Sequence, residues 1–257
     1  MEDTYLYHPA EFPKPPVQVN HISSTFDITE ERVIVFAETT FTVLTDKLDE
    51  LILNAKNLEI QTIHQNSRPL QYTYLNNLIT IKLLRPLSKG AVFKIVTNSI
   101  CRPTANILEG IYFDVTPAGL PKTMITQCQQ WGFQRICPCV DDMRAKCTWI
   151  TRIIADTRYT NLISNGNIAS ERTRFDETRD TITYRNDEPM PRICSSSVWE
   201  PGIHSPVISS IRMEKRSGWN FLRQKVRTNQ TQIMLLKSWL TVSSGHIFTQ
   251  VPSGMML

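Results

Sequence analysis

The stretch Leu78-Ile79-Thr80-Ile81-Lys82-Leu83 alternates apolar and polar residues with a period of two. This alternation places the two isoleucines and Leu83 on one face, as in a strand that buries one side of a sheet. Residues 58–63 repeat the pattern, and residues 32–44 are rich in Val, Ile, Phe and Thr, which favour strands. These segments predict extended structure in the first part of the chain.

Further strands of the same character are expected at residues 93–100, 147–155 and 181–185. Turn residues separate the candidates, among them Asn76-Asn77, Ser88-Lys89-Gly90 and Asn165-Gly166. The sequence contains no convincing amphipathic helix and no internal repeat. Many short strands with frequent turns predict an all-β domain, built as a sandwich or as an open, curved set of sheets.

The bulk composition is that of a soluble globular protein, with 41% hydrophobic and 20% charged residues. No run approaches 18 consecutive apolar residues, so we expect no membrane partner. The first residues, Met1-Glu2-Asp3, are acidic and lack the basic-then-apolar order of a signal peptide. We therefore expect a cytoplasmic protein.

The composition changes after residue 192. Residues 193–257 contain seven Lys or Arg, two Glu and no Asp, a net charge of +5, so residues 1–192 carry −1 of the total of +4. A basic tail can indicate nucleic acid. Here the basic residues form no amphipathic stripe and no nucleic-acid module is present, so we expect no nucleic-acid partner. The sequence predicts a domain at 1–192 and a disordered or non-native tail at 193–257.

The residues needed for metal-dependent peptide hydrolysis are missing from the chain. A zinc peptidase uses two histidines one helical turn apart and a glutamate as base, in the motif H-E-x-x-H. No two histidines here lie four residues apart; they are His8, His21, His64, His204 and His246. Chemistry alone indicates that these residues hold no catalytic metal and that the chain is not an enzyme by itself.

The six cysteines are expected to be buried, reduced thiols. They stand at positions 101, 128, 137, 139, 147 and 194, without the paired C-x-x-C knuckles of structural zinc sites. The neighbours Asp141 and Asp142 could suggest an acid/base pair. Adjacent residues on a strand point to opposite faces, so turn or cap roles are favoured for both.

The central part of the chain combines several motifs in a fixed order. They are Asn106-Ile107-Leu108-Glu109-Gly110-Ile111-Tyr112, Thr126-Gln127-Cys128-Gln129, Arg135, Cys137-Pro138-Cys139-Val140-Asp141, Lys146, Leu162-Ile163-Ser164-Asn165-Gly166 and Met190-Pro191. Together they resemble the amino-terminal β-domain of the aminopeptidase N and leukotriene hydrolase family of zinc metallopeptidases. Weaker similarity extends over most of residues 20–192.

This resemblance implies a saddle-like arrangement of mixed and antiparallel sheets that leans on a zinc-containing catalytic domain. It also implies two substrate-binding residues: Gln127, which lines the pocket for the terminal side chain, and Gln129, which helps to anchor the free amine. The second position commonly carries Glu in the family. The neutral Gln129 should anchor the amine more weakly. Arg135, Asp141 and Lys146 are expected to be structural.

The tail does not show the apolar strand, G-V-G-T and Y-P-D-G that follow in the family. Combining the last base of each codon with the first two of the next gives a different reading. Residues 193–201 then permit Met-Phe-Phe-Phe-Gly-Val-Gly-Thr, in which Trp199-Glu200 forces the last Gly. Residues 211–215 permit Pro-Asp-Gly-Lys, again with a forced Gly. The tail is therefore interpreted as out-of-frame translation.

These observations predict a truncated fragment of a zinc-dependent aminopeptidase, inactive alone. Its peptide substrate would be a partner only in the intact enzyme, and zinc would be a cofactor there but not in this chain. The alternative is a free-standing, non-catalytic β-domain that binds a protein or peptide partner. If the tail supplies no strand, the strand near residues 181–185 lacks a neighbour and the fragment should be poorly soluble.

Overall fold

The computed structural model describes residues 14–116, 118–201, 213–216 and 219–222. Strands dominate the described part, which confirms the all-β prediction, and its helical turns η2 (Phe133–Arg135) and η3 (Arg192–Cys194) are short 3-10 segments. The chain divides into two units, residues 1–203 and 204–257. In the second unit, β16 (Met213–Arg216) and β17 (Trp219–Leu222) form an antiparallel hairpin.

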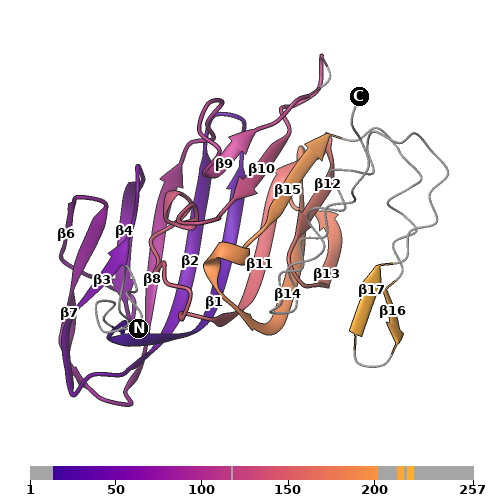
Figure 1. Cartoon of the computed structure of the whole chain (residues 1–257). Helices are drawn as coiled ribbons and strands as arrows, with labels where there is room; N and C mark the ends of the chain where they lie inside the picture. Colours follow the sequence, from indigo (N-terminus) through magenta and orange to yellow (C-terminus); the bar gives the residue numbers. More distant parts are fainter. Residues whose placement is uncertain (1–13, 117, 202–212, 217–218, 223–257) are drawn as a thin grey trace, which may run out of the picture. The chain divides into compact units, whose positions relative to one another are not determined.

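The first unit is built on one large sheet (Figure 1). In spatial order its strands are β13 (Asn167–Arg174), β14 (Arg179–Met190), β11 (Cys147–Asp156), β1 (Val17–Ile28), β2 (Val33–Val43), β8 (Val92–Cys101), β4 (Glu59–Gln65) and β5 (Arg68–Pro69). β1 and β11 run parallel, and the other neighbouring strands of this sheet are antiparallel. The sheet is therefore mixed, as the family resemblance implies.

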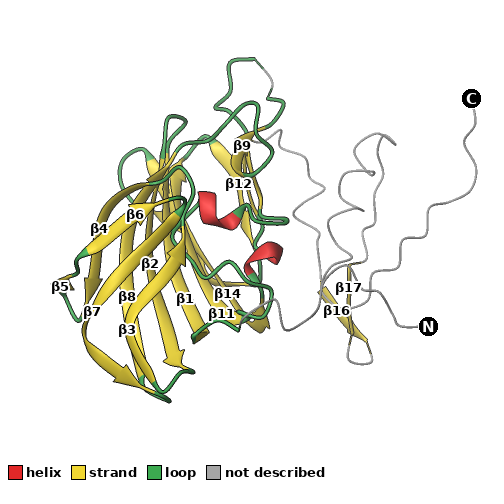
Figure 2. Ribbon diagram, turned by 60° about the vertical axis from the view of Figure 1, so that its left-hand side comes forward, coloured by secondary structure: helices red, strands yellow, loops and turns green. Residues whose placement is uncertain are grey.

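Two smaller sheets complete the unit. One has the order β12 (Tyr159–Ser164), β15 (Ser197–Pro201), β10 (Met124–Gln127) and β9 (Gly110–Phe113). The other has the order β3 (Lys47–Asn54), β7 (Leu78–Ser88) and β6 (Tyr72–Leu75). Figure 2 shows the three-stranded sheet in front of β2 and β8.

The core lies between the large sheet and the small ones. β1 and β2 bury almost every second side chain, and one connected cluster of buried apolar residues draws on all three sheets. The ring of Phe26 on β1 lies 6.0 Å from that of Trp199 on β15, and Phe133 of η2 meets Trp149 of β11 edge-on at 5.4 Å. Removing this apolar surface from water is the main stabilising contribution.

The period-two prediction is confirmed where it was clearest. Ile79 and Ile81 are fully buried on β7, and the expected turn at Asn76-Asn77 connects β6 to β7. Both asparagines have positive φ, 52° and 62°. That is the backbone of a type I′ hairpin turn, whose twist matches that of the flanking strands.

Two expectations about the end of the domain are wrong. The strand predicted at residues 181–185 is the twelve-residue β14, and it has neighbours on both sides, β11 and β13. Residues after 192 do supply a strand, because β15 pairs with β10 and with β12. Trp199 is fully buried on β15. This one large apolar side chain anchors the strand in the core, although the surrounding sequence shows no alternation of apolar and polar residues. The out-of-frame origin of 193–257 stays a prediction.

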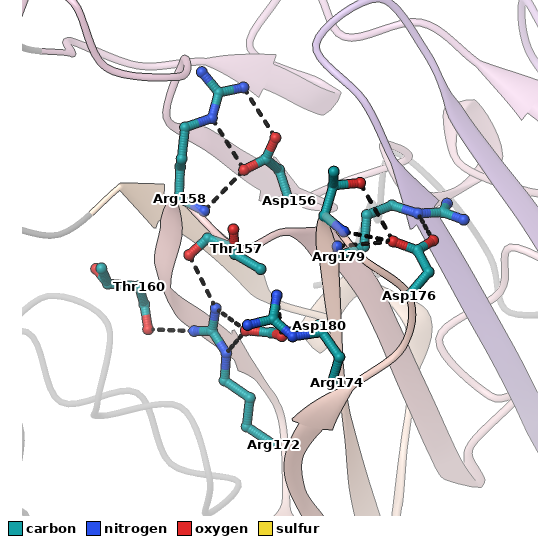
Figure 3. Close-up of polar contacts among 10 residues, drawn as sticks. Asp156, Thr157, Arg158, Thr160, Arg172, Arg174, Asp176, Arg179 and Asp180 are labelled. Carbon is teal, nitrogen blue, oxygen red and sulfur yellow. Dashed lines mark hydrogen bonds and ion pairs between the residues drawn. The ribbon is translucent and has the colours of Figure 1, made fainter.

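The outermost strand β13 is tied down by an arginine–carboxylate network (Figure 3). The guanidinium of Arg172 donates to a carboxylate oxygen of Asp180 at 2.9 Å and to the backbone carbonyls of Thr160 and Thr157. Arg174 joins the same carboxylate. Because Thr157 lies in the β11–β12 connection and Thr160 lies on β12, Arg172 links the edge of the large sheet to the four-stranded sheet.

Candidate functional site

The two glutamines singled out by motif lie together where β10 ends. Gln127 is the last residue of β10 and stands opposite Gly110 of β9. Gln129 follows in an exposed turn, and its backbone N–H donates to Oε1 of Gln127 at 3.4 Å. The fold therefore presents both side chains from one short segment at a strand end.

A glycine fixes the shape of this turn. The backbone N–H of Gly132 donates to the carbonyl of Cys128 at 3.0 Å. A Cβ at Gly132 would collide with the backbone carbonyl of Gln127. The backbone φ of Gly132 is an ordinary −72°, so close approach, and not conformational freedom, requires glycine here.

An ion cluster holds the turn against the start of β9. The guanidinium of Arg135 contacts the carboxylate of Glu109 at 2.7 Å, and the ammonium of Lys56 reaches the same oxygen at 3.5 Å. The hydrogen bond from Arg135 holds the pKa of Glu109 below its usual range. The expected structural role of Arg135 is confirmed. The parts played by Glu109 and Lys56 were missed, because residues 53 positions apart in the chain give no local signal.

Behind the turn, Asp141 and Arg192 are buried in one polar cluster. The backbone N–H of Asp141 donates to the side-chain oxygen of Asn54 at 3.1 Å, while its Oδ2 has no partner within the described part of the chain. Arg192 is fully buried, and one of its nitrogens donates to the carbonyl of Ala145 at 3.1 Å. Burial raises the pKa of Asp141 to about 6, and the positive charge of Arg192 only partly opposes that rise.

This raised pKa gives a prediction about stability. The folded chain holds the Asp141 proton more tightly than the unfolded chain, whose carboxyl titrates near 3.8. The resulting stabilisation is complete below pH 3.8 and is lost as the pH rises through about 6. Asp141→Asn copies the protonated side chain and should be about 2 kcal/mol more stable than the parent at pH 7, with the gap closing near pH 4.

Urea unfolding of the parent and of Asp141→Asn at pH 4, 5, 6 and 7 checks this prediction. Comparing the two chains cancels the titration of other carboxylates, such as Glu109 and Asp142, whose lowered pKa values act in the opposite direction. A difference in unfolding free energy that does not change between pH 4 and pH 7 would contradict it.

The other acidic and basic motif residues have plain structural roles or none. Asp142 accepts hydrogen bonds from the backbone and the side chain of Arg144, so it is a turn residue as expected. Lys146 is exposed, and within the described part of the chain its ammonium forms no ion pair. The structural role expected for this residue therefore rests on its backbone carbonyl, which accepts a hydrogen bond from the side chain of Gln18.

The described residues do not gather potential metal ligands into a cluster. Five of the six cysteines are buried and all six are free. Burial raises the pKa of Cys137 to about 12 and that of Cys147 to about 11, although the charge of Arg192 opposes the rise at both. At neutral pH such buried thiols are protonated and therefore unreactive. Across residues 14–116, 118–201, 213–216 and 219–222, no group of three or more potential ligands comes together.

The comparisons with known proteins decide the family. The model of the Peptidase M1 N-terminal domain matches residues 20–192, about two thirds of the chain and the span over which the motifs run. The chain belongs to this family. In this Peptidase M1 N-terminal domain, Gln127 and Gln129 lie well inside the matched span.

Two curated relatives are aminopeptidases N. The enzyme from Escherichia coli strain K12 is 26% identical over 185 residues, and the one from Haemophilus influenzae is 28% identical over 185 residues. These alignments cover 72% and 70% of this chain but only 20% of each relative. The chain thus corresponds to about a fifth of the length of the relatives it matches.

Solved structures share the fold. The aminopeptidase A of Legionella pneumophila, solved in complex with aspartic acid, superposes with a TM-score of 0.66 at 20% identity, over 74% of this chain and 22% of that one. An M1 zinc metallopeptidase from Deinococcus radiodurans gives 0.64 at 14% identity, over 73% and 43%. Within the described residues, none of the helical segments has the length and apolar character needed to span a membrane.

Proposed function

We propose that this Peptidase M1 N-terminal domain forms part of the substrate pocket of a zinc-dependent aminopeptidase, and that its contribution is the segment holding Gln127 and Gln129. The observation that carries the proposal is the joint position of these two side chains at the end of β10, inside the span matched by the family model. The curated relatives, aminopeptidases N, support the reaction class.

The chemistry of the two glutamines suits binding but not bond cleavage. An amide neither ionises nor activates water at neutral pH, yet its carbonyl oxygen accepts hydrogen bonds. Gln129, exposed in the turn, can accept one from the free ammonium of a peptide. Gln127, anchored in β10, lines the wall beside it. The zinc and the catalytic base would come from outside these 257 residues, which contain no H-E-x-x-H motif.

We further propose that the residues after Arg192 are read out of frame. The forced glycines of the shifted reading and the change of composition support this. The structure adds a physical observation: among the described residues, the indole Nε1 of Trp199 on β15 is one of six buried polar atoms without a partner. An orphaned buried donor costs about 1–3 kcal/mol. A strand whose residues were not selected for this position in the sheet would leave such a donor unpaired.

Sequencing the gene through the codons for residues 185–200, followed by kinetics of the enzyme read in the restored frame, tests both proposals. A frame that runs open into an H-E-x-x-H motif supports them. In that enzyme Gln129→Glu should tighten the anchoring of the substrate amine by about 1.5–3 kcal/mol, because a carboxylate adds charge to the hydrogen bond. KM should then fall about tenfold or more.

Gln130→Glu is the matched control, since it adds the same charge at the neighbouring exposed position. Equal effects of the two changes, or no change in KM and kcat/KM for Gln129→Glu, would remove Gln129 from the pocket.

A second candidate function is a free-standing β-domain that binds a protein or peptide partner. The observation that favours it is β15, which completes the four-stranded sheet between β10 and β12 from residues beyond 192. If sequencing confirms the present codons and the chain accumulates in folded form, this second function gains and the out-of-frame proposal is lost.

A further inference from the structure

A cavity of about 410 Å³ opens between the β4–β5 hairpin and β7. The hairpin lies at the end of the large sheet and β7 belongs to the three-stranded sheet (Figure 2), both far along the chain from Gln127 and Gln129. Its lining consists of Gln65, Asn66, Arg68, Leu84 and Arg85. Four of these side chains are polar, two are cationic and none is a carboxylate, so the cavity offers donors and positive charge.

Gln65 gives the cavity a fixed donor. This side chain is only 5% exposed, and its Oε1 accepts a hydrogen bond from the backbone N–H of Leu84 at 3.1 Å. A backbone N–H can bond only to the oxygen of an amide, so the NH₂ group of Gln65 must point the other way. That Nε2 forms no hydrogen bond with any described residue, and it is not sealed from solvent. Because Gln65 lines the cavity, this Nε2 is available as a donor for a ligand there.

Arg68 and Arg85 add two charges that nothing in the described part of the chain neutralises. Other arginines here are held by carboxylates, for example Arg135 by Glu109 and Arg172 by Asp180. Arg68 is on β5 and Arg85 is on β7, and neither makes an ion pair or a side-chain hydrogen bond with a described residue. Two like charges brought to one cavity repel each other, and a bound anion would remove that repulsion.

We propose that this cavity is a binding site for a phosphate group, as inorganic phosphate or as the phosphate of a small molecule. A phosphate near neutral pH carries up to two negative charges and several acceptor oxygens, which match two guanidinium groups and the amide donor of Gln65. Leu84 is the only apolar side chain of the lining, and the two guanidinium groups and the two amides supply donors for a small hydrated anion. The site is independent of the aminopeptidase proposal.

Calorimetric titration of the full chain with inorganic phosphate, at constant ionic strength in chloride, tests the site. We expect saturable binding of one phosphate per chain. Arg68→Gln and Arg85→Gln should each weaken it at least tenfold. Arg32→Gln is the matched control, because Arg32 is also exposed and its guanidinium also makes no hydrogen bond or ion pair with a described residue, yet it lies outside the cavity.

If the heat of phosphate binding is too small for calorimetry, the melting temperature of each variant with and without phosphate provides a second measurement. Phosphate should raise the melting temperature of the parent and of Arg32→Gln but not of the Arg68→Gln, Arg85→Gln double variant, since a ligand stabilises only the state that binds it. Equal weakening by Arg32→Gln would show that phosphate senses only the general surface charge and would overturn the site. Acetate binding as tightly as phosphate would overturn the assignment to phosphate.

Discussion

Replacing Trp199 by alanine is expected to lower the free energy of unfolding by about 3–5 kcal/mol. Trp199 is fully buried on β15 and its ring lies 6.0 Å from Phe26 of the large sheet. Removing the indole leaves a cavity at the point where the four-stranded sheet meets β1. Because the rest of β15 is short, no other large side chain on it can compensate.

Urea unfolding of the full chain measures this loss. Trp131→Ala is the control, since Trp131 is 53% exposed and its removal should change stability by less than about 0.5 kcal/mol. Trp199→Phe adds a second comparison. It keeps most of the apolar ring and removes an indole N–H that has no partner within the described residues, so it should cost far less than alanine. A loss below about 1 kcal/mol for Trp199→Ala would contradict the seating of β15 in the core.

Gly166→Ala is the second change with a large expected effect, about 3 kcal/mol of lost stability. Gly166 lies in the turn between β12 and β13 with φ of +93°, in the left-handed region that side chains avoid. An added Cβ would also collide with the backbone carbonyl of Arg185 on β14. The turn would have to move away, and β13 would lose register with β14.

Gly90→Ala separates the two causes. Gly90 has a similar φ of +82°, but an added Cβ there meets nothing within 4 Å. Gly90→Ala should therefore lower the free energy of unfolding only by the cost of a left-handed backbone for alanine, about 1–2 kcal/mol. Equal losses for the two variants, measured by urea unfolding, would show that the contact with Arg185 adds nothing.

Local patterns predicted the strands whose side chains alternate. Residues 79 to 83 on β7 and the turn at Asn76-Asn77 needed only a period of two and a pair of turn residues. The full length of β14, Arg179–Met190, could not be predicted from local patterns. Proline cannot donate to a strand ladder, yet β14 continues past Pro189 to Met190. The pairing with β11 shifts register between Cys147 and Trp149, which leaves Pro189 where no ladder bond is required.

In the candidate site, too, local motifs were predicted from the sequence and contacts between distant residues were not. Its two glutamines were found by motif, and the structure brings them together at the end of β10. The groups that hold them were not predicted, because Lys56 and Glu109 become neighbours only through tertiary folding. β15 was missed for a related reason: its position depends on one buried tryptophan and on strands from elsewhere in the chain, not on a pattern of its own.

The parallel pairing of β1 with β11 sets the order in which a nascent chain can fold. His21 of β1 cannot pair with Thr148 of β11, its partner in the ladder, until the ribosome has added 127 more residues. At a synthesis rate of about 5–20 residues per second this delay is on the order of ten seconds. During that interval β1 can pair with β2 but leaves its other edge open. Completion of the large sheet is therefore a late, non-local event, and until then one edge of β1 is an unpaired template for other strands.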